Sequence, residues 1–173
     1  DASCADATIR VALRASDVQS VRWALNALRT WMAGGMAAPL SIGDRPDFRW
    51  RGVIEGFYGN PWTHTQRLRG IEHFADFGMN LFLLAPKDAA WQRLRWREPL
   101  SADFIADMRE LLAAGARHAV NVSACVSPGL SVQYSDAADV AAVVAKFAQL
   151  AALGATHFGL LLDDIPDTLS NDD

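Results

Sequence analysis

Residues 136–164 read DAADVAAVVAKFAQLAALGATHFGLLLDD, and this stretch decides the fold class. Its first part is rich in alanine and valine and stops before Gly154, which predicts a helix over 136–153. The run 157–162 is almost entirely apolar, as in a buried strand, and Asp163 and Asp164 follow it directly. A helix that leads through a short turn into such a strand is the repeating unit of a parallel α/β sheet.

The same unit recurs toward the N-terminus, as far back as residue 51. Apolar stretches predict strands over 51–56, 79–84 and 118–123, and helices are predicted over 65–77 and 103–114, with Ser101 capping the second. Four strands thus alternate with three helices. Because the strands are nearly unbroken apolar runs, we expect a parallel sheet that is covered on both faces.

The N-terminal part has a different organisation. Residues 8–14 alternate in polarity and predict a half-exposed strand, and Ser16 and Gln19 have the spacing of a capping box at the start of a helix. This helix has one apolar face and ends at Gly34 and Gly35. One strand and one helix cannot enclose a core. We therefore interpret residues 1–46 as the C-terminal part of a small α/β domain plus a linker, and 47–173 as a second domain.

The composition is that of a globular protein and argues against several function classes. The 173 residues are 51% hydrophobic and 21% charged, with a formal net charge of −4. An acidic chain is a poor match for nucleic acid or an anionic membrane surface, and no apolar run approaches the roughly 20 residues that cross a bilayer. The first residues show no signal-peptide pattern, so the compartment stays open, with secretion expected for a bacterial source.

The cysteines and histidines predict neither a disulfide nor a metal site. Cys4 and Cys125 are far apart in the sequence, and we interpret them as two unrelated thiols, with Cys125 buried. The four histidines lack the spacing of metal ligands. No glycine-rich motif that would hold a phosphate group is present either.

The segments that follow the four predicted strands carry the candidate chemistry. These segments are 55–59, 85–88, 127–129 and 163–164. The carboxyl ends of parallel strands lie at one edge of a sheet, and the active sites of such folds gather there. We therefore expect the four segments to meet at one rim.

Asp163 and Asp164 give the strongest signal in this set. The pKa values of two neighbouring carboxylates should be pushed apart, so that one stays protonated while the other is ionised. Such a pair suits general acid–base catalysis on a glycosidic or ester bond. The residues alone leave two alternatives open: a helix N-cap or loop satisfied by backbone amides, and a Mg²⁺ site.

Lys87 and two glycines are candidate binding groups at the same rim. Lys87 can donate to a sugar hydroxyl, a phosphate or a carboxylate, or it can face the solvent beside Asp88. Gly56 and Gly59 permit a ligand to approach the backbone closely. The two aromatic residues between them fit either a sugar-stacking platform or core packing, and core packing is favoured.

Several long motifs resemble glycoside hydrolase family 84, which comprises the O-GlcNAcases and the bacterial β-N-acetylglucosaminidases that are often described as hyaluronidases. The motifs are GVIEGFYGNPW (52–62), APKD (85–88), WRE (96–98), VSPGL (126–130) and LLDDI (161–165). They follow the order and spacing of the family over residues 51–166. The part before residue 51 is similar to the end of the small α/β domain that precedes the family's barrel.

The resemblance implies a (β/α)8 TIM barrel of which about the first four βα strands are present, since a whole barrel needs about 250 residues. It also implies a retaining β-N-acetylglucosaminidase whose substrate supplies the nucleophile, forming an oxazoline intermediate. Asp163 would orient and polarise the acetamido N–H, and Asp164 would act as general acid and then base. Lys87 and the Gly56 carbonyl would bind sugar hydroxyls. No metal or organic cofactor is implied.

The resemblance implies the partners as well. The expected substrate is terminal β-linked N-acetylglucosamine on a glycan or glycoprotein. The half-barrel alone is expected to be inactive and to self-associate through its open sheet edges. The alternative function is a non-catalytic half-barrel that binds carbohydrate or acts only through assembly. The sequence departs from the family pattern at residues 89–93 (AAWQR), where the family has a further Asp and then a polar or aromatic stretch carrying His, so the role of this loop stays open, though not that of Lys87.

Overall fold

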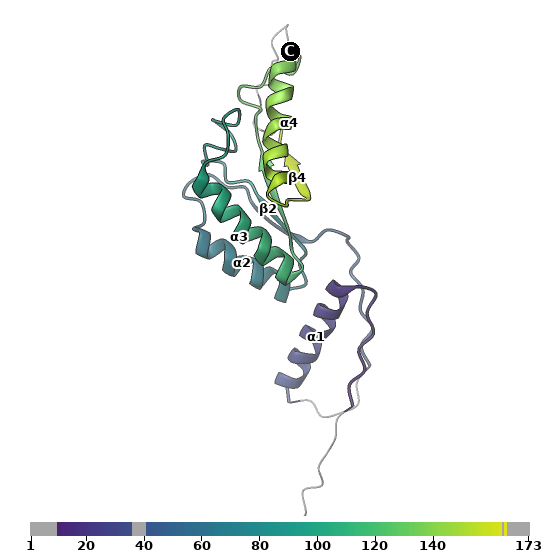
Figure 1. Ribbon diagram of the computed structural model, residues 1–173. Helices are drawn as coiled ribbons and strands as arrows, with labels where there is room; N and C mark the ends of the chain where they lie inside the picture. The colour runs from purple at the N-terminus through teal and green to yellow at the C-terminus, as the bar shows by residue number, and fades with distance from the viewer. Residues whose placement is uncertain (1–9, 36–40, 164, 166–173) are drawn as a thin grey trace, which may run out of the picture. The chain divides into compact units, whose positions relative to one another are not determined.

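The computed structural model describes residues 10–35, 41–163 and 165, and the chain divides into two units, Asp1–Arg45 and Pro46–Asp173. The elements in chain order are α1 (Val18–Ala33), β1 (Gly52–Glu55), α2 (His64–Asp76), β2 (Leu81–Leu84), α3 (Ala102–His118), β3 (Asn121–Val126), α4 (Ala137–Ala152) and β4 (His157–Leu160) (Figure 1). Within the described ranges, no helix combines the length and the apolar character that a bilayer span requires.

In the first unit, α1 forms as predicted, but its N-terminus differs from the expectation. The N-cap is Asp17, whose carboxylate accepts a hydrogen bond from the Ser20 amide at 2.7 Å. The prediction of a capping box formed by Ser16 and Gln19 is therefore wrong. The Asp17 carboxylate, one residue after Ser16, accepts the hydrogen bond from the first turn instead. The helix ends at the predicted pair of glycines, and Gly35 has a φ of 66°.

The strand predicted over 8–14 is wrong where the structure describes it. Residues 10–15 form no strand, and residues 8 and 9 lie outside the described residues. A strand needs a partner for its backbone N–H and C=O groups, and the sheet of the described residues pairs β1 to β4 with one another. Alternating polarity does not supply such a partner. The assignment of residues 1–46 to a small α/β domain stays a prediction.

The second unit contains a parallel four-stranded sheet in the order β1-β2-β3-β4. Glu55, Leu84, Ala124 and Phe158 stand side by side across it. One helix lies in each connection, so every strand pairs with the next strand along the chain. A doubly wound sheet reverses its strand order at a switch point, whereas a barrel keeps it, so this order is typical of a barrel.

The predicted boundaries hold within two residues except where α3 meets β3 and at the end of β3. The strand predicted over 118–123 begins three residues later, at Asn121, because α3 continues to His118 and turns at Ala119, which has a left-handed φ of 55°. Ser101 caps α3 as predicted, and Asp136 caps α4. The apolar run of the third strand therefore extends through Cys125 and Val126 to the rim.

The hydrophobic core lies between the sheet and helices α2, α3 and α4. Its strand members are Phe82, Leu84, Val122 and Ala124, and its helix members include Ile71 and Ala75, Met108, Leu111 and Ala114, and Leu150. Side chains alternate across a strand, so these strand residues share one face. The opposite face is covered only in part among the described residues, since Ser123 and Cys125 on it are buried while Ile54 is 48% exposed. In a barrel that face becomes the interior.

Gly115 lies directly against β3, so its replacement by alanine should destabilise the fold. A Cβ at this position would lie 2.5 Å from the Val120 carbonyl oxygen and 2.9 Å from Val122 Cγ2. We expect Gly115→Ala to lower the free energy of unfolding by about 2 kcal/mol in urea titrations, despite the higher helix propensity of alanine. Gly70→Ala in α2 is the control, because its Cβ would meet the Phe74 ring at 3.2 Å and no backbone. Equal losses in both variants would contradict the prediction.

Candidate active site

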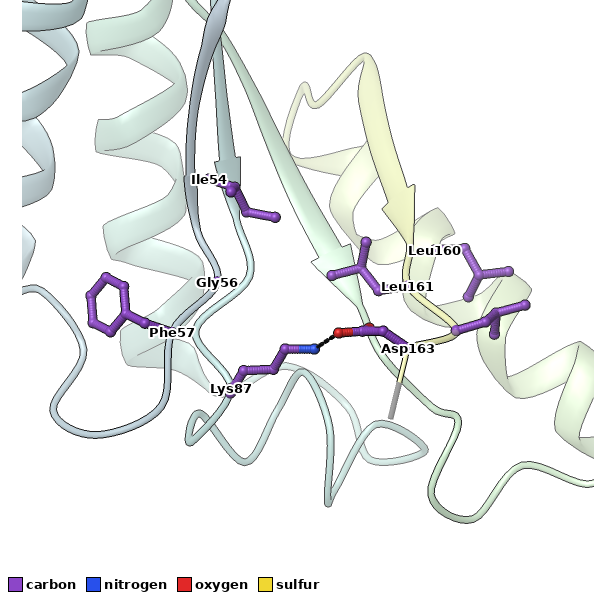
Figure 2. A pocket seen from close by; sticks show the side chains of 8 residues that line it. Ile54, Gly56, Phe57, Lys87, Leu160, Leu161 and Asp163 are labelled. Atoms are coloured by element: carbon purple, nitrogen blue, oxygen red, sulfur yellow. Dashed lines mark hydrogen bonds and ion pairs between the residues drawn. The ribbon is translucent and has the colours of Figure 1, made fainter. Parts of the chain in front are cut away.

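The ends of β1, β2 and β4 surround a hollow of about 440 Å³ at the carboxyl edge of the sheet (Figure 2). Its lining residues are Ile54, Gly56, Phe57, Lys87, Leu160, Leu161, Leu162 and Asp163. The volume falls in the range of about 300–1,000 Å³ that is usual for small-molecule sites. Gly56, Lys87 and Asp163, three of the four predicted site residues, thus meet at one place. The fourth, Asp164, lies outside the described residues.

An ion pair joins Lys87 Nζ to Asp163 Oδ2 at this hollow. Figure 2 shows the two side chains pointing toward one another from the ends of β2 and β4. The Lys87 side chain is 6% exposed, so the alternative in which it faces the solvent is wrong, while Asp163 is 49% exposed. A buried ammonium needs a counter-charge, which Asp163 supplies. The pair presents hydrogen-bond donors and acceptors to a polar ligand at the same point.

Backbone contacts join the segments that follow β1 and β2. The Lys87 amide donates to the Phe57 carbonyl at 3.2 Å, and the Gly59 amide donates to Asp88 Oδ2 at 2.6 Å. The pairing of the two strands therefore continues past their ends as far as the rim. Gly56 lies within this joined region, which fixes its backbone at the hollow.

Glu55 belongs to the strand-end segments but has a structural position. Its carboxylate is completely buried and faces α2, where Arg67 Nε and Nη2 each donate to it at 2.8 Å. The Trp62 amide adds a third hydrogen bond at 2.9 Å. A carboxylate that is paired and hydrogen-bonded in this way fixes the loop between β1 and α2. It does not line the hollow.

The two aromatic residues after β1 have different positions. The Phe57 ring points away from Lys87 in Figure 2 and packs edge-on against Trp62, with 5.7 Å between the ring centroids. Tyr58 is 61% exposed, and its hydroxyl accepts a hydrogen bond from Arg93 Nη1 at 2.8 Å. The sequence analysis missed Arg93, because its one signal was its place in the loop after the second strand.

The loop between β3 and α4 is held by the segment that follows β2. Arg97 donates to both carboxylate oxygens of Asp139, at 2.6 and 2.5 Å, and to the Ser131 carbonyl at 2.6 Å. Trp96 Nε1 donates to Ser131 Oγ at 3.1 Å. The Ser127 amide donates to the Gln92 carbonyl at 2.9 Å. These anchors fix the segment after β3 at the same rim as the hollow.

Cys125 is the buried free thiol that the sequence predicted, while Cys4 lies outside the described residues. Burial raises the pKa of the Cys125 thiol to about 11, so the group is protonated at neutral pH. In the parts of the chain that the structure describes, His, Cys, Asp and Glu form no group of three or more that could hold a metal ion.

The family is decided by a comparison with known sequences. The family model of the beta-N-acetylglucosaminidases matches residues 51–173. The chain belongs to this family. The protein O-GlcNAcases of Rattus norvegicus and Mus musculus are each 34% identical to this chain over 114 residues, which is 66% of the chain. The chain spans 12% of the length of these curated relatives.

Solved structures of similar proteins share the fold. A variant of the Thermobaculum terrenum O-GlcNAc hydrolase is 33% identical with a TM-score of 0.70, covering 72% of this chain and 27% of that chain. CpGH84B is 35% identical with a TM-score of 0.68, covering 72% of this chain and 22% of its own. The resemblance to glycoside hydrolase family 84 is thus confirmed, as is the fold class of a partial α/β barrel.

The pair of Asp139 and Arg97 should make stability depend on pH in the acid range. Hydrogen bonds from Arg97 are the main cause that lowers the pKa of Asp139 below its ordinary 3.8, and the Gln133 amide adds to them. Because the folded-state pKa lies below the unfolded one, this stabilisation is complete above about pH 5 and is lost as the pH falls through the folded-state pKa. We expect the free energy of unfolding to fall less steeply between about pH 5 and pH 2 in Asp139→Asn than in the wild type.

Urea titrations at a series of pH values measure this difference. Asp103→Asn, which neutralises an exposed carboxylate in the first turn of α3, is the matched control and should keep the wild-type slope. Parallel curves for Asp139→Asn and the wild type would contradict the prediction.

Proposed function

We propose that this β-N-acetylglucosaminidase removes terminal β-linked N-acetylglucosamine from glycans or glycoproteins, with retention and through an oxazoline formed by the substrate. The observation that carries the proposal is the meeting of Lys87, Asp163 and the Gly56 backbone at one hollow. An N-acetylglucosamine ring offers hydroxyls and one acetamido N–H, and an ammonium, a carbonyl and a carboxylate are matching partners for these groups. Membership of the family supports the same substrate class.

In the first step, the acetamido oxygen attacks the anomeric carbon and the bond from that carbon to the leaving oxygen breaks. Asp164 gives its proton to the leaving oxygen. Asp163 accepts a hydrogen bond from the acetamido N–H and stays anionic, so it stabilises the positive charge that develops on the nitrogen. The ion pair with Lys87 supports this role, because it orients the Asp163 carboxylate before the substrate binds.

In the second step, a water molecule attacks the anomeric carbon and Asp164 takes up its proton. The bond between this carbon and the oxazoline oxygen breaks, which restores the acetamido group and leaves the sugar in the β configuration. Lys87 has three N–H donors and can therefore bind a sugar hydroxyl while it keeps its contact with Asp163. The Gly56 carbonyl accepts a hydrogen bond from a second hydroxyl.

We expect Asp163→Asn and Asp164→Asn to lower activity in different ways in the complete polypeptide. A phenolate leaves without much help from an acid, so Asp164→Asn should lose little kcat/KM on a nitrophenyl N-acetyl-β-glucosaminide. It should lose about 10²–10⁴-fold on an alkyl glycoside, whose leaving group must be protonated. Asp163→Asn should lose a similar factor on both substrates, because attack by the acetamido oxygen is common to both.

The same assays contain their controls. Asp103→Asn should keep full activity on both substrates, and addition of EDTA should leave the wild-type rate unchanged. A rate that EDTA abolishes would favour the Mg²⁺ alternative for the Asp pair. Full activity of Asp164→Asn on the alkyl glycoside would overturn the proposed mechanism.

The exposed interior face favours a second candidate function, in which the half-barrel acts only through assembly. Ile54 is 48% exposed on this face, Leu160 is 51% exposed on the helix-facing side of β4, and β1 and β4 are the edges of the described sheet. Open edges and uncovered apolar side chains promote association. In our main proposal the same features mean that activity needs the remaining strands of the barrel.

We therefore predict that the 173-residue chain alone is inactive and self-associates, whereas a C-terminally extended polypeptide is active. Light scattering and sedimentation measure the association, and the nitrophenyl glycoside measures activity. Wild-type activity from a monomeric 173-residue chain would contradict the prediction. Carbohydrate binding without hydrolysis in both forms would favour the second candidate.

A further inference from the structure

We infer that Gly129, in the loop after β3, is a positioning residue that sets the place of Asp163 and Ile165 after β4. The inference rests on the proposed function for the importance of that place. Gly129 is buried, and a Cβ built on it would lie 2.5 Å from Ile165 Cγ2 and 3.6 Å from the Asp163 carbonyl oxygen. A side chain at position 129 would thus contact both residues that flank Asp164 in the sequence.

Close approach, and not backbone conformation, is what requires glycine here. The glycines with a positive φ in the described residues are Gly35, Gly59, Gly78 and Gly154, and Gly129 is not among them. An alanine could therefore adopt the backbone angles of residue 129 without strain. Its methyl group would nevertheless overlap Ile165, because real Cβ atoms essentially never approach another heavy atom to 2.5 Å.

The loop that carries Gly129 is firmly held. The Pro128 carbonyl accepts hydrogen bonds from the Ser131 and Val132 amides, both at 3.0 Å, which closes a turn around Gly129. Ser131 is in turn bound by Trp96 and Arg97, and the Trp96 side chain is fully buried. A methyl group at position 129 is therefore expected to displace Ile165 rather than the loop.

Displacement of Ile165 should disturb catalysis more than binding. Residue 165 is one peptide unit from Asp164 and two from Asp163, whose carboxylate contacts Lys87 at the hollow. A shift of about 1 Å in catalytic groups costs about 10²-fold in rate. We expect Gly129→Ala to lower kcat about 10–100-fold with little change in KM, and to lower it more on an alkyl glycoside than on a nitrophenyl glycoside.

A compensating substitution separates positioning from general damage. Ile165→Ala removes the Cγ2 atom that the new methyl group would meet, and the Ile165 Cβ at 3.8 Å leaves room for it. In the complete polypeptide, Gly129→Ala combined with Ile165→Ala should recover the kcat of Ile165→Ala alone. This non-additivity is the signature of two residues in direct contact. Gly43→Ala, where a Cβ meets nothing within 4 Å, is the control and should change neither kcat nor the melting temperature.

Each outcome of this double-mutant cycle decides the inference. Unchanged kcat in Gly129→Ala, or a double variant as slow as Gly129→Ala, would overturn it. A loss of melting temperature in Gly129→Ala that accounts for the whole loss of activity would overturn it as well. Failure of the proposed function appears separately, as full activity of Asp163→Asn, or of Asp164→Asn on the alkyl glycoside. In that case, the melting temperatures of the wild type, the two single variants and the double variant still test the contact between residues 129 and 165.

Discussion

Parallel pairing of β1 to β4 in sequence order is the constraint on which the rest of the structure depends. It places every strand end at one edge, so residues as distant in the sequence as Gly56, Lys87 and Asp163 line one hollow. The two faces of the sheet also have different roles. Side chains toward the helices form the core, while those on the opposite face and beyond the strand ends are available to a ligand. No single segment of the chain holds the site, because each strand end contributes one part of it.

Three arginines hold the loops that follow the strands at the rim of the hollow. Arg67 binds Glu55, Arg97 binds Asp139 and the loop after β3, and Arg93 binds the Tyr58 hydroxyl after β1. A guanidinium can donate two parallel hydrogen bonds to one carboxylate in a fixed geometry, which an ammonium cannot do. Loop arrangements that break the Glu55–Arg67 pair are disfavoured, because they would leave a buried charge without its partner. The single lysine of the hollow, Lys87, contacts Asp163 instead, where a compact charge with rotatable donors suits a ligand site.

The sequence predicts the fold well because apolar runs and caps are local signals, and it predicts the site less well because the site depends on register. Ser101 and the glycines after α1 mark helix ends by chemistry that acts within one turn. The boundary of β3 was displaced because α3 continues to His118 and ends at Ala119 in a left-handed conformation, at a residue type that does not mark a helix end. Glu55 and Asp163 are both carboxylates at strand ends, yet one faces α2 and the other faces the hollow. Which face a strand-end residue takes follows from its place in the register, and composition does not carry that information.

The two sides of the hollow are fixed by different kinds of interaction. The segments after β1 and β2 are joined by hydrogen bonds, among them the bond from the Gly59 amide to Asp88. The segments of β3 and β4 are fitted by close contact: Gly159 lies where a Cβ would be 2.5 Å from Cys125 Sγ, and Gly129 lies equally close to Ile165. Steric fit of this kind does not change with pH or salt, whereas hydrogen bonds to a carboxylate do. Asp163 follows the sterically fitted strand, so its backbone position is insulated from the charge changes that catalysis itself produces.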